Sequence, residues 1–278
     1  MTDKNPLRNI GLYILLALGS VVFSLPFLWT VSTALKTPEN VFKSPPQLLP
    51  QPVAWDNFGK AWTALPFPTY VGNTVFIAVA VTAAQVLTGS LVAYGFARFR
   101  FRARNVLFYL LLSTMMLPSQ VTMIPVFLIW RQAHMIDTFW PLILPAFFGG
   151  SAFNIFLLRQ FFLSLPKELD EAALMDGASY LRIWWSILLP LARPAVVAVT
   201  LFTFLAHWDD FMGPLIYLNS PEKYTVSIGL KMFQDSYSAN LEQMMAASLI
   251  HILPTIILFF LAQRYFIKGI TLSGIGGR

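Results

Sequence analysis

The chain has 278 residues, of which 56% are hydrophobic and 12% are charged, and its formal net charge is +6. A soluble domain carries roughly 25% charged residues, so the excess apolar surface must face lipid and we predict an all-α, polytopic membrane protein. The absence of cysteine excludes disulfides, thiolate metal sites and cysteine nucleophiles.

Six stretches are long and apolar enough to cross a bilayer, which takes roughly 20 mostly apolar residues. The predicted transmembrane helices cover 10–35, 70–96, 106–130, 138–163, 194–217 and 245–267. Lys4 and Arg8 precede the first stretch, as they would in a signal peptide. Its apolar run continues through Leu35 without a small-residue cleavage pattern, so we expect a first span that is not removed.

Basic residues indicate the orientation of these helices. Of the 19 Lys and Arg residues, 13 lie in the two termini, in 97–105 and in 159–193. Because cytoplasmic loops are enriched in Lys and Arg, both termini are predicted to be cytoplasmic. The block RFRFRAR (98–104) is the strongest anchor. The positive charge is therefore attributed to membrane orientation, and we expect no nucleic-acid partner.

This topology divides the chain into four parts. They are an N-terminal cytoplasmic segment with the first helix (1–35), a Pro-rich extracytoplasmic loop (36–69), a transmembrane domain (70–267) and a cytoplasmic tail (268–278). The loop contains seven Pro and favours an extended, polyproline-like path. Two roles remain open for it: a cover over the helix ends, or a platform for an extracytoplasmic partner.

A charged stretch with a glycine in its middle, ELDEAALMDGASYLRIWWSILLP (168–190), falls on the cytoplasmic side. It is typical of two short helices joined at Gly177, which can take the left-handed conformation. Ser164 is expected to cap the first helix, with Pro166 in its first turn. The acidic residues that follow would lie near the positive end of the helix dipole.

The first of these helices would present a face of small side chains to the cytosol. Leu169, Ala172 and Ala173 share one side of it, and a low alanine face suits docking to a soluble partner. Ser179 is expected to cap the second helix, and Pro190 to interrupt it. The alternative is an amphipathic helix on the lipid headgroups, which the letters IWW favour for the second helix only.

The spacing in this loop resembles the EAA loop of bacterial ABC-importer permeases. Glu171-Ala172-Ala173, three residues, Gly177, nine residues, Ile187, one residue and Leu189-Pro190 match each defining position, and Asp176 precedes the glycine as in the commonest form. Residues 73–101 resemble the opening of the type-1 transmembrane domain of these permeases. Residues 208–230 resemble the span-five region of carbohydrate-uptake permeases, particularly the maltose-transporter permease with six spans. That family often has Trp-Asn-Glu where this chain has Trp208-Asp209-Asp210.

The resemblance implies an ABC type-1 transmembrane domain in the bacterial inner membrane. The partners would be a second permease subunit, two ATPase subunits and an extracytoplasmic substrate-binding protein, with lipid around the helices. The loop 164–193 would insert into a cleft of an ATPase, with Glu171 as polar anchor, Ala172 and Ala173 as close contact and Gly177 as the turn. This chain would bind no cofactor. ATP and Mg²⁺ would bind the partners, because the chain has no GxxxxGK[ST] phosphate loop.

Polar groups inside the spans are functional candidates, because burying them in a membrane is costly. The predicted substrate-pathway residues are Asn73, Gln120, Asn154, Trp208, Asp209 and Asp210. Trp208 would stack on a sugar ring while the two carboxylates accept hydroxyl hydrogen bonds. We expect Gly213-Pro214 to break the helix. The alternative to the sugar contact is a structural kink whose acids pair with the second permease or face external water. Each amide is otherwise a link between helices. Two kinks are also expected near these amides, at Pro118-Ser119-Gln120 and at Gly149-Gly150-Ser151.

Two other functions were weighed. An intramembrane enzyme needs a catalytic constellation, but the three His residues form no HExxH or comparable cluster. His207 and Asp210 have no third ligand nearby, so we expect neither a metal site nor catalytic residues. The resemblance to carbohydrate-uptake permeases implies that the cargo is a sugar, either a di- or an oligosaccharide. A different cargo, such as glycerol phosphate, a polyol or another small solute, remains open. An anionic cargo favours basic groups in the spans, and these are almost absent away from the ends.

Overall fold

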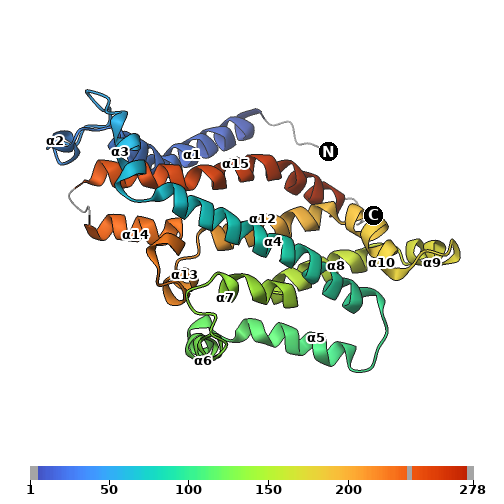
Figure 1. Cartoon of the computed structure of the whole chain (residues 1–278). Helices are drawn as coiled ribbons and strands as arrows, with labels where there is room; N and C mark the ends of the chain where they lie inside the picture. Colours follow the sequence, from blue (N-terminus) through green and yellow to red (C-terminus); the bar gives the residue numbers. More distant parts are fainter. Residues whose placement is uncertain (1–5, 237–239, 274–278) are drawn as a thin grey trace. The chain divides into compact units, whose positions relative to one another are not determined.

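The computed structural model describes the chain except for residues 1–5, 237–239 and 274–278. Every regular element in the described part is a helix, which confirms the all-α class (Figure 1). The chain divides into two units, Met1–Phe67 with Gly229–Leu253 and Pro68–Ile228 with Pro254–Arg278.

Four helices in the described residues are individually long and apolar enough to span a membrane. They are Ile10–Ala34, Phe67–Arg98, Trp140–Ser164 and Leu241–Gln263. Two further pairs of helices pass the same test only together, at bends of 103° and 84°. The predicted count of six spans is therefore reached when each bent pair is one span.

The first unit contains α1 (Pro6–Ala34), α2 (Pro38–Val41) and α3 (Asp56–Ala64). The buried amide of Asn57 in α3 donates to the carbonyl oxygens of Ala34 and Lys36, both at 2.8 Å. These bonds attach the start of α3 to the end of α1. The extended path expected for 36–69 is thus only partly right, because two helices interrupt it.

The first bent pair replaces the straight span expected at 106–130. It consists of α5 (Arg104–Ser113), a 3₁₀ turn to Met116, and α6 (Ser119–Gln132), with 103° between the two arms. Leu117 is extended (ψ 118°) because Pro118 disfavours the helical conformation of the residue before it. The kink expected at Pro118 is confirmed.

The core of the second unit lies between three helices. These are α4 (Phe67–Arg98), α8 (Ala152–Ser164) and α12 (Arg193–Trp208). Fully buried side chains from each helix meet in one cluster, which includes Ala93, Leu158, Phe162 and Val199. Small residues such as alanine allow the helix backbones to approach closely in a membrane.

The chain breaks once between α7 (Trp140–Ile143), with its 3₁₀ continuation to Phe148, and α8. Gly149 and Gly150 take the left-handed conformation there, at φ 95° and 59°. The kink predicted at Gly149-Gly150-Ser151 is confirmed. The break leaves backbone groups that need partners inside the membrane.

The span expected at 194–217 also divides, but not at Gly213-Pro214 as predicted. The helix α12 ends at Trp208, and α13 covers Met212–Tyr217. Pro214 is the third residue of α13, in the first turn, where its missing N–H costs little. Asp210 accepts a hydrogen bond from the Gly213 N–H at 3.1 Å, so the break falls at 209–211.

A carboxylate joins two loops of the second unit after α6 and α13. Asp137 accepts hydrogen bonds from the backbone N–H groups of Asn219 (2.9 Å) and Ser220 (3.0 Å), and from Lys223 Nζ at 2.8 Å. Lys223 and then Ser220 hold the pKa of this carboxyl well below its usual range. We call this connection the Asp137 latch.

The remaining helices are η4 (Pro221–Lys223), α14 (Val226–Ser236) and α15 (Leu241–Ser273). The predicted tail 268–278 is helical up to Ser273, and its last five residues lie outside the described part.

Candidate functional site

The loop 164–193 contains the helix α9 (Glu168–Met175), followed by Gly177 at φ 78°. The N–H of Gly177 donates to Leu174 O at 3.0 Å, and the N–H of Ala178 donates to Ala173 O at 2.9 Å. This pair of bonds is the Schellman ending that a left-handed glycine permits. The predicted glycine joint is confirmed.

The expected start of this helix is wrong. Ser164 belongs to the end of α8, and its hydroxyl donates to Phe161 O at 2.7 Å. Lys167 is the residue before α9, and Pro166 precedes it. The backbone is extended at Leu165, after the end of α8. The new helix therefore begins three residues later than a cap at Ser164 would give.

The two alanines do not share one accessible face. Ala172 is exposed, whereas Ala173 is 8% exposed and belongs to the core cluster of the second unit. Ala173 thus fixes α9 to its own chain. The surface that remains for a partner includes Leu169, Glu171, Ala172 and Met175, all exposed.

The second half of the loop is one continuous helical run. Ser179 Oγ accepts from the Arg182 N–H at 3.3 Å, as predicted for a cap. The run continues from α10 (Tyr180–Ile183) through a π-helical turn (Trp184–Leu188) into α11 (Leu189–Leu191).

Pro190 therefore does not interrupt the helix, contrary to expectation. The preceding π-helical turn lies where a proline would otherwise clash with the backbone before it. Ile187 and Leu189 are partly buried against the core cluster, while Pro190 is exposed. The bend of 84° comes later, before Arg193.

An ion pair that was not predicted fixes α9 to the end of α4. Arg98 Nε lies 2.6 Å from Asp170 Oδ2, and the two side chains are 5% and 14% exposed. The same guanidinium donates to Leu165 O from both terminal nitrogens, at 3.2 Å. Burial raises the pKa of Asp170, which Arg98 opposes by favouring the charged form. Arg98 is one of four arginines in the block 98–104, and nothing in the sequence distinguished it as the partner of Asp170.

A groove of about 530 Å³ lies beside this ion pair. Its lining residues come from the end of α4, the residues that follow it and the loop 164–193: Tyr94, Arg98, Phe99, Arg100, Lys167, Asp170, Glu171, Leu174 and Tyr180. Phe99 and Tyr180 meet edge to face at 5.0 Å. These contacts attach the loop 164–193 to the end of α4.

A second cavity of about 420 Å³ lies among the membrane helices of the same unit, and we call it the membrane pocket. It is lined by Val81, Gln85, Leu142, Pro145, Ala146, Gly150, Ser151, Phe153, Asn154, Phe202, Thr203, Ala206 and His207. Apolar walls with a few polar groups are typical of small-molecule sites. Asn154 is the predicted pathway residue that lines it.

Gln85 connects one wall of the membrane pocket to the break before α8. Its Nε2 donates to Gly149 O at 2.8 Å, and its Oε1 accepts from the Ser151 N–H at 2.7 Å. A Cβ on Gly150 would lie 1.8 Å from Gln85 Oε1. Glycine is therefore required for close approach of the amide. The sequence shows Gln85 only as a polar residue in a span.

The opposite wall is also held by hydrogen bonds. Asn154 Nδ2 donates to Thr203 Oγ1 at 2.9 Å and so joins α8 to α12. His207 Nδ1 lies 2.8 Å from Thr203 O, and the tautomer decides which of them donates. In the described part of the chain no group of three or more His, Asp or Glu residues is arranged to hold a metal ion.

The other predicted pathway residues lie away from the membrane pocket. Asn73 donates to Glu222 O (2.9 Å) and Tyr224 O (3.0 Å), so it joins α4 to the loop after α13. Gln120 is exposed on α6. Both amides were assigned to the pathway because sequence position alone does not give the direction of a side chain.

Trp208 does not have the position expected of a residue that stacks on a sugar ring. The side chain is 1% exposed and its ring stacks on Phe204 at 5.7 Å, so it cannot stack on a sugar in this structure. Asp209 is exposed after the end of α12, and Asp210 caps the first turn of α13. The kink interpretation of this motif agrees with these contacts.

Comparisons with known proteins agree with this architecture. The family model described as binding-protein-dependent transport system inner membrane component matches residues 85–272. An arabinooligosaccharide transport system permease protein of Halalkalibacterium halodurans is 36% identical over 82% of this chain and 81% of its own. An sn-glycerol-3-phosphate transport system permease protein of Yersinia enterocolitica is 32% identical over 94% and 95%.

Among solved structures, a chain of a bacterial ABC transporter involved in the import of the acidic polysaccharide alginate matches with a TM-score of 0.84 at 26% identity. The match covers 96% of this chain and 99% of that chain. The EAA-type loop, the helical fold and the sequence similarity point to the same conclusion. The chain belongs to the family of binding-protein-dependent transport system inner membrane components, and it is an ABC-importer permease of the bacterial inner membrane.

Proposed function

We propose that this permease imports a neutral oligosaccharide through the membrane pocket. The observation that carries the proposal is the lining of the pocket, in which His207 is the only titratable side chain. Amide and hydroxyl groups from Gln85, Ser151, Asn154 and Thr203 form its polar part. Such groups exchange hydrogen bonds with sugar hydroxyls and give no charge to balance an anion.

A second cargo is a small anion such as glycerol phosphate. The observation in its favour is the 32% identical relative named for sn-glycerol-3-phosphate transport, which matches nearly the whole chain. A phosphate in this cavity would lie among apolar walls without Lys or Arg in the lining. Burying an uncompensated charge costs several kcal/mol, roughly, so the neutral cargo fits these residues better.

The transport complex would contain a second permease, two ATPase subunits and an extracytoplasmic substrate-binding protein. The termini and the loop 164–193 would be cytoplasmic. The exposed residues Glu171, Ala172 and Met175 of α9 would enter a cleft of one ATPase. ATP and Mg²⁺ would be bound by the ATPases, and this chain would bind no cofactor and catalyse no hydrolysis.

The helix α4 provides the route from that loop to the cargo. Arg98 at its end holds Asp170 of α9, and Gln85 on the same helix lines the membrane pocket. These two residues are about 20 Å apart along a continuous helix at ~1.5 Å per residue. A movement that the ATPases impose on α9 would shift α4, and with it the wall of the pocket that faces the cargo.

The test uses the whole complex in proteoliposomes, with ATP on the side of the ATPases and the binding protein on the other. Neutral arabino-oligosaccharide, alginate oligosaccharide and sn-glycerol-3-phosphate are compared for stimulation of ATP hydrolysis and for uptake. We expect stimulation and uptake with the neutral oligosaccharide. Uptake of glycerol phosphate alone would overturn the cargo and keep the importer. Uptake of alginate alone would overturn the neutral character of the pocket.

A further inference from the structure

The turn between α4 and α5 carries positive charge that the chain itself does not balance. Residues 97–105 contain four arginines and no acidic residue. Arg98 is neutralised by Asp170. Within the described part of the chain, Arg100, Arg102 and Arg104 take part in no ion pair.

Two of these arginines line a pocket of about 520 Å³. The pocket is formed by Arg100, Phe101, Ala103, Arg104, Asn105 and Val106, and we call it the arginine pocket. Arg104 Nη1 donates to Phe99 O at 3.3 Å, and its Nε donates to Asn105 Oδ1 at 3.4 Å. These bonds orient its guanidinium at the wall. Arg102 is exposed and does not line the pocket.

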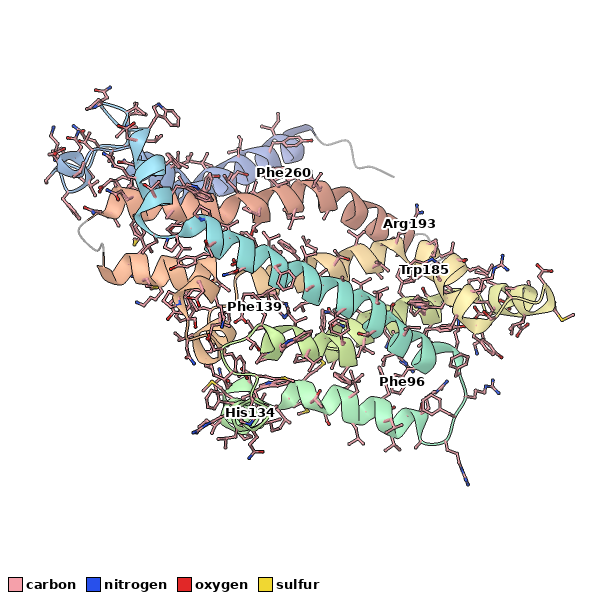
Figure 2. The ribbon with its side chains drawn as sticks, in the orientation of Figure 1. Phe96, His134, Phe139, Trp185, Arg193 and Phe260 are labelled. Atoms are coloured by element: carbon pink, nitrogen blue, oxygen red, sulfur yellow. The ribbon has the colours of Figure 1, made fainter. Side chains whose placement is uncertain are left out.

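A further positive charge lies next to this turn. The guanidinium of Arg159 lies over the ring of Phe108 in α5, at 4.0 Å. Its Nε donates to Phe96 O at 3.3 Å. Phe96 lies two residues before the end of α4 (Figure 2). The Glu171 carboxylate lines the neighbouring groove with Arg100 but not the arginine pocket.

The apolar side of the arginine pocket continues along α5. Phe101 and Val106 line the pocket and are 43% and 59% exposed. Further along the helix Leu107 and Leu110 are exposed. In an inner-membrane protein such a helix surface faces hydrocarbon. The arginine pocket therefore lies where a basic surface meets an apolar one, which is the position of lipid headgroups.

We propose that the arginine pocket binds the headgroup of an anionic phospholipid. Its phosphate would accept hydrogen bonds from Arg100 and Arg104, because guanidinium groups match phosphate oxygens. An acyl chain would follow the exposed face of α5. Each basic residue near an anionic leaflet contributes ~1 kcal/mol to lipid attraction. A soluble phosphate would use the arginines but gain nothing from the apolar wall.

The experiment measures lipid selectivity of the complete complex in phosphatidylcholine bilayers that contain spin-labelled lipid. The ratio of bound to free label is compared for phosphatidylglycerol and phosphatidylcholine. Arg100→Gln is the test variant and Arg102→Gln the matched control, since both side chains are exposed and both substitutions remove one charge from the same turn. Arg104→Gln is a second test.

We expect selective binding of phosphatidylglycerol by the wild type and by Arg102→Gln. Arg100→Gln and Arg104→Gln should each weaken it about fivefold, the factor that corresponds to ~1 kcal/mol. Equal effects of the 100 and 102 substitutions would overturn the proposal and leave general surface charge as the cause. Complete displacement of the labelled lipid by inorganic phosphate, at constant ionic strength, would overturn the lipid and identify a free anion as the ligand.

Discussion

Arg98 and Asp170 form a buried ion pair at 2.6 Å between the end of α4 and the first turn of α9. It connects the membrane helices to the loop 164–193, which we propose enters a cleft of an ATPase. Replacing one partner leaves the other charge buried and uncompensated, which costs about 3–5 kcal/mol.

We therefore expect Arg98→Met to lower the thermal stability of the complex and to abolish coupled uptake. Arg98→Met combined with Asp170→Leu should recover most of the stability, because it leaves no unpaired charge. Thermal unfolding and ATP-driven uptake measure the two effects. The exposed Arg182 serves as control, since Arg182→Met should leave stability unchanged. Full uptake by Arg98→Met alone would show that the pair does not transmit movement.

Gly177 is the residue of the loop 164–193 whose backbone conformation limits which side chains it can carry. Its φ is 78°, and a Cβ there would meet no atom within 4 Å. Gly177→Val should thus act through strain alone, at about 1–2 kcal/mol for a left-handed residue. We expect it to reduce co-purification of the ATPases and uptake severalfold, with normal membrane insertion. Gly177→Asn tolerates this conformation and should retain most activity; equal loss in both variants would refute backbone strain as the cause.

Gly150 lies against Gln85, and both the lack of space and the left-handed backbone limit substitution at this glycine. A methyl group would overlap Gln85 Oε1, at 1.8 Å. We expect Gly150→Ala to displace the amide from the Ser151 N–H and to lower both the unfolding temperature and uptake. The control is Gly95→Ala on α4, where a Cβ meets nothing within 4 Å. An unchanged unfolding temperature in Gly150→Ala would contradict the described packing of Gln85.

Thr203 tests the polar wall of the membrane pocket. Thr203→Val keeps the shape but removes the acceptor of the Asn154 amide, which costs about 1–3 kcal/mol when the amide stays buried. We expect the KM for uptake of the cargo to rise severalfold. Thr200→Val on the exposed side of α12 is the matched control, with a bond only to Val196 O in its own helix. Equal KM values in the two variants would exclude this wall from cargo contact.

The Asp137 latch predicts a pH dependence. The folded pKa of Asp137 is lowered, so its stabilising effect is complete above the ordinary aspartate pKa of ~3.9 and declines as the pH falls below it. Asp137→Asn should cost about 1.5–3 kcal/mol at pH 7. The difference in unfolding temperature between wild type and variant should shrink below about pH 4.

Glu222→Gln is the control for this experiment, because Glu222 is an exposed acid of the same loop. Its unfolding temperature should follow the wild type at each pH. A difference between wild type and Asp137→Asn that stays constant from pH 7 to the acid range would show that the carboxylate charge does not stabilise the latch.

The sequence predicted the features that rest on local rules. Hydropathy located the spans, and proline and glycine located the bends at Leu117 and Gly149. The glycine joint at 177 and the cap at Ser179 follow from backbone preferences of single residues. The EAA spacing identified the permease family, because the motif depends on residue identities at fixed intervals.

The errors concern direction and distance, which a single sequence does not contain. Asn73 and Gln120 have the polarity of pathway residues but do not line the membrane pocket. Trp208 is next to two acids in sequence, yet its ring lies in the core. The Arg98 and Asp170 pair joins residues far apart in the chain, and no pattern within one helix indicates such a partner. Pro190 is tolerated because a π-helical turn precedes it, a feature that propensities do not predict.

The hydrogen bonds of Asn73 have a consequence for the direction of signalling. Asn73 attaches the start of α4 to the loop at 222–224, and Arg98 attaches its end to α9. Thermodynamic coupling between two sites is reciprocal. If, in the proposed complex, nucleotide binding to the ATPases changes the affinity of the loop at 222–224 for a protein, then binding of that protein changes the nucleotide affinity by the same factor. The loaded binding protein would thereby report the presence of cargo to the ATPases before any cargo has crossed.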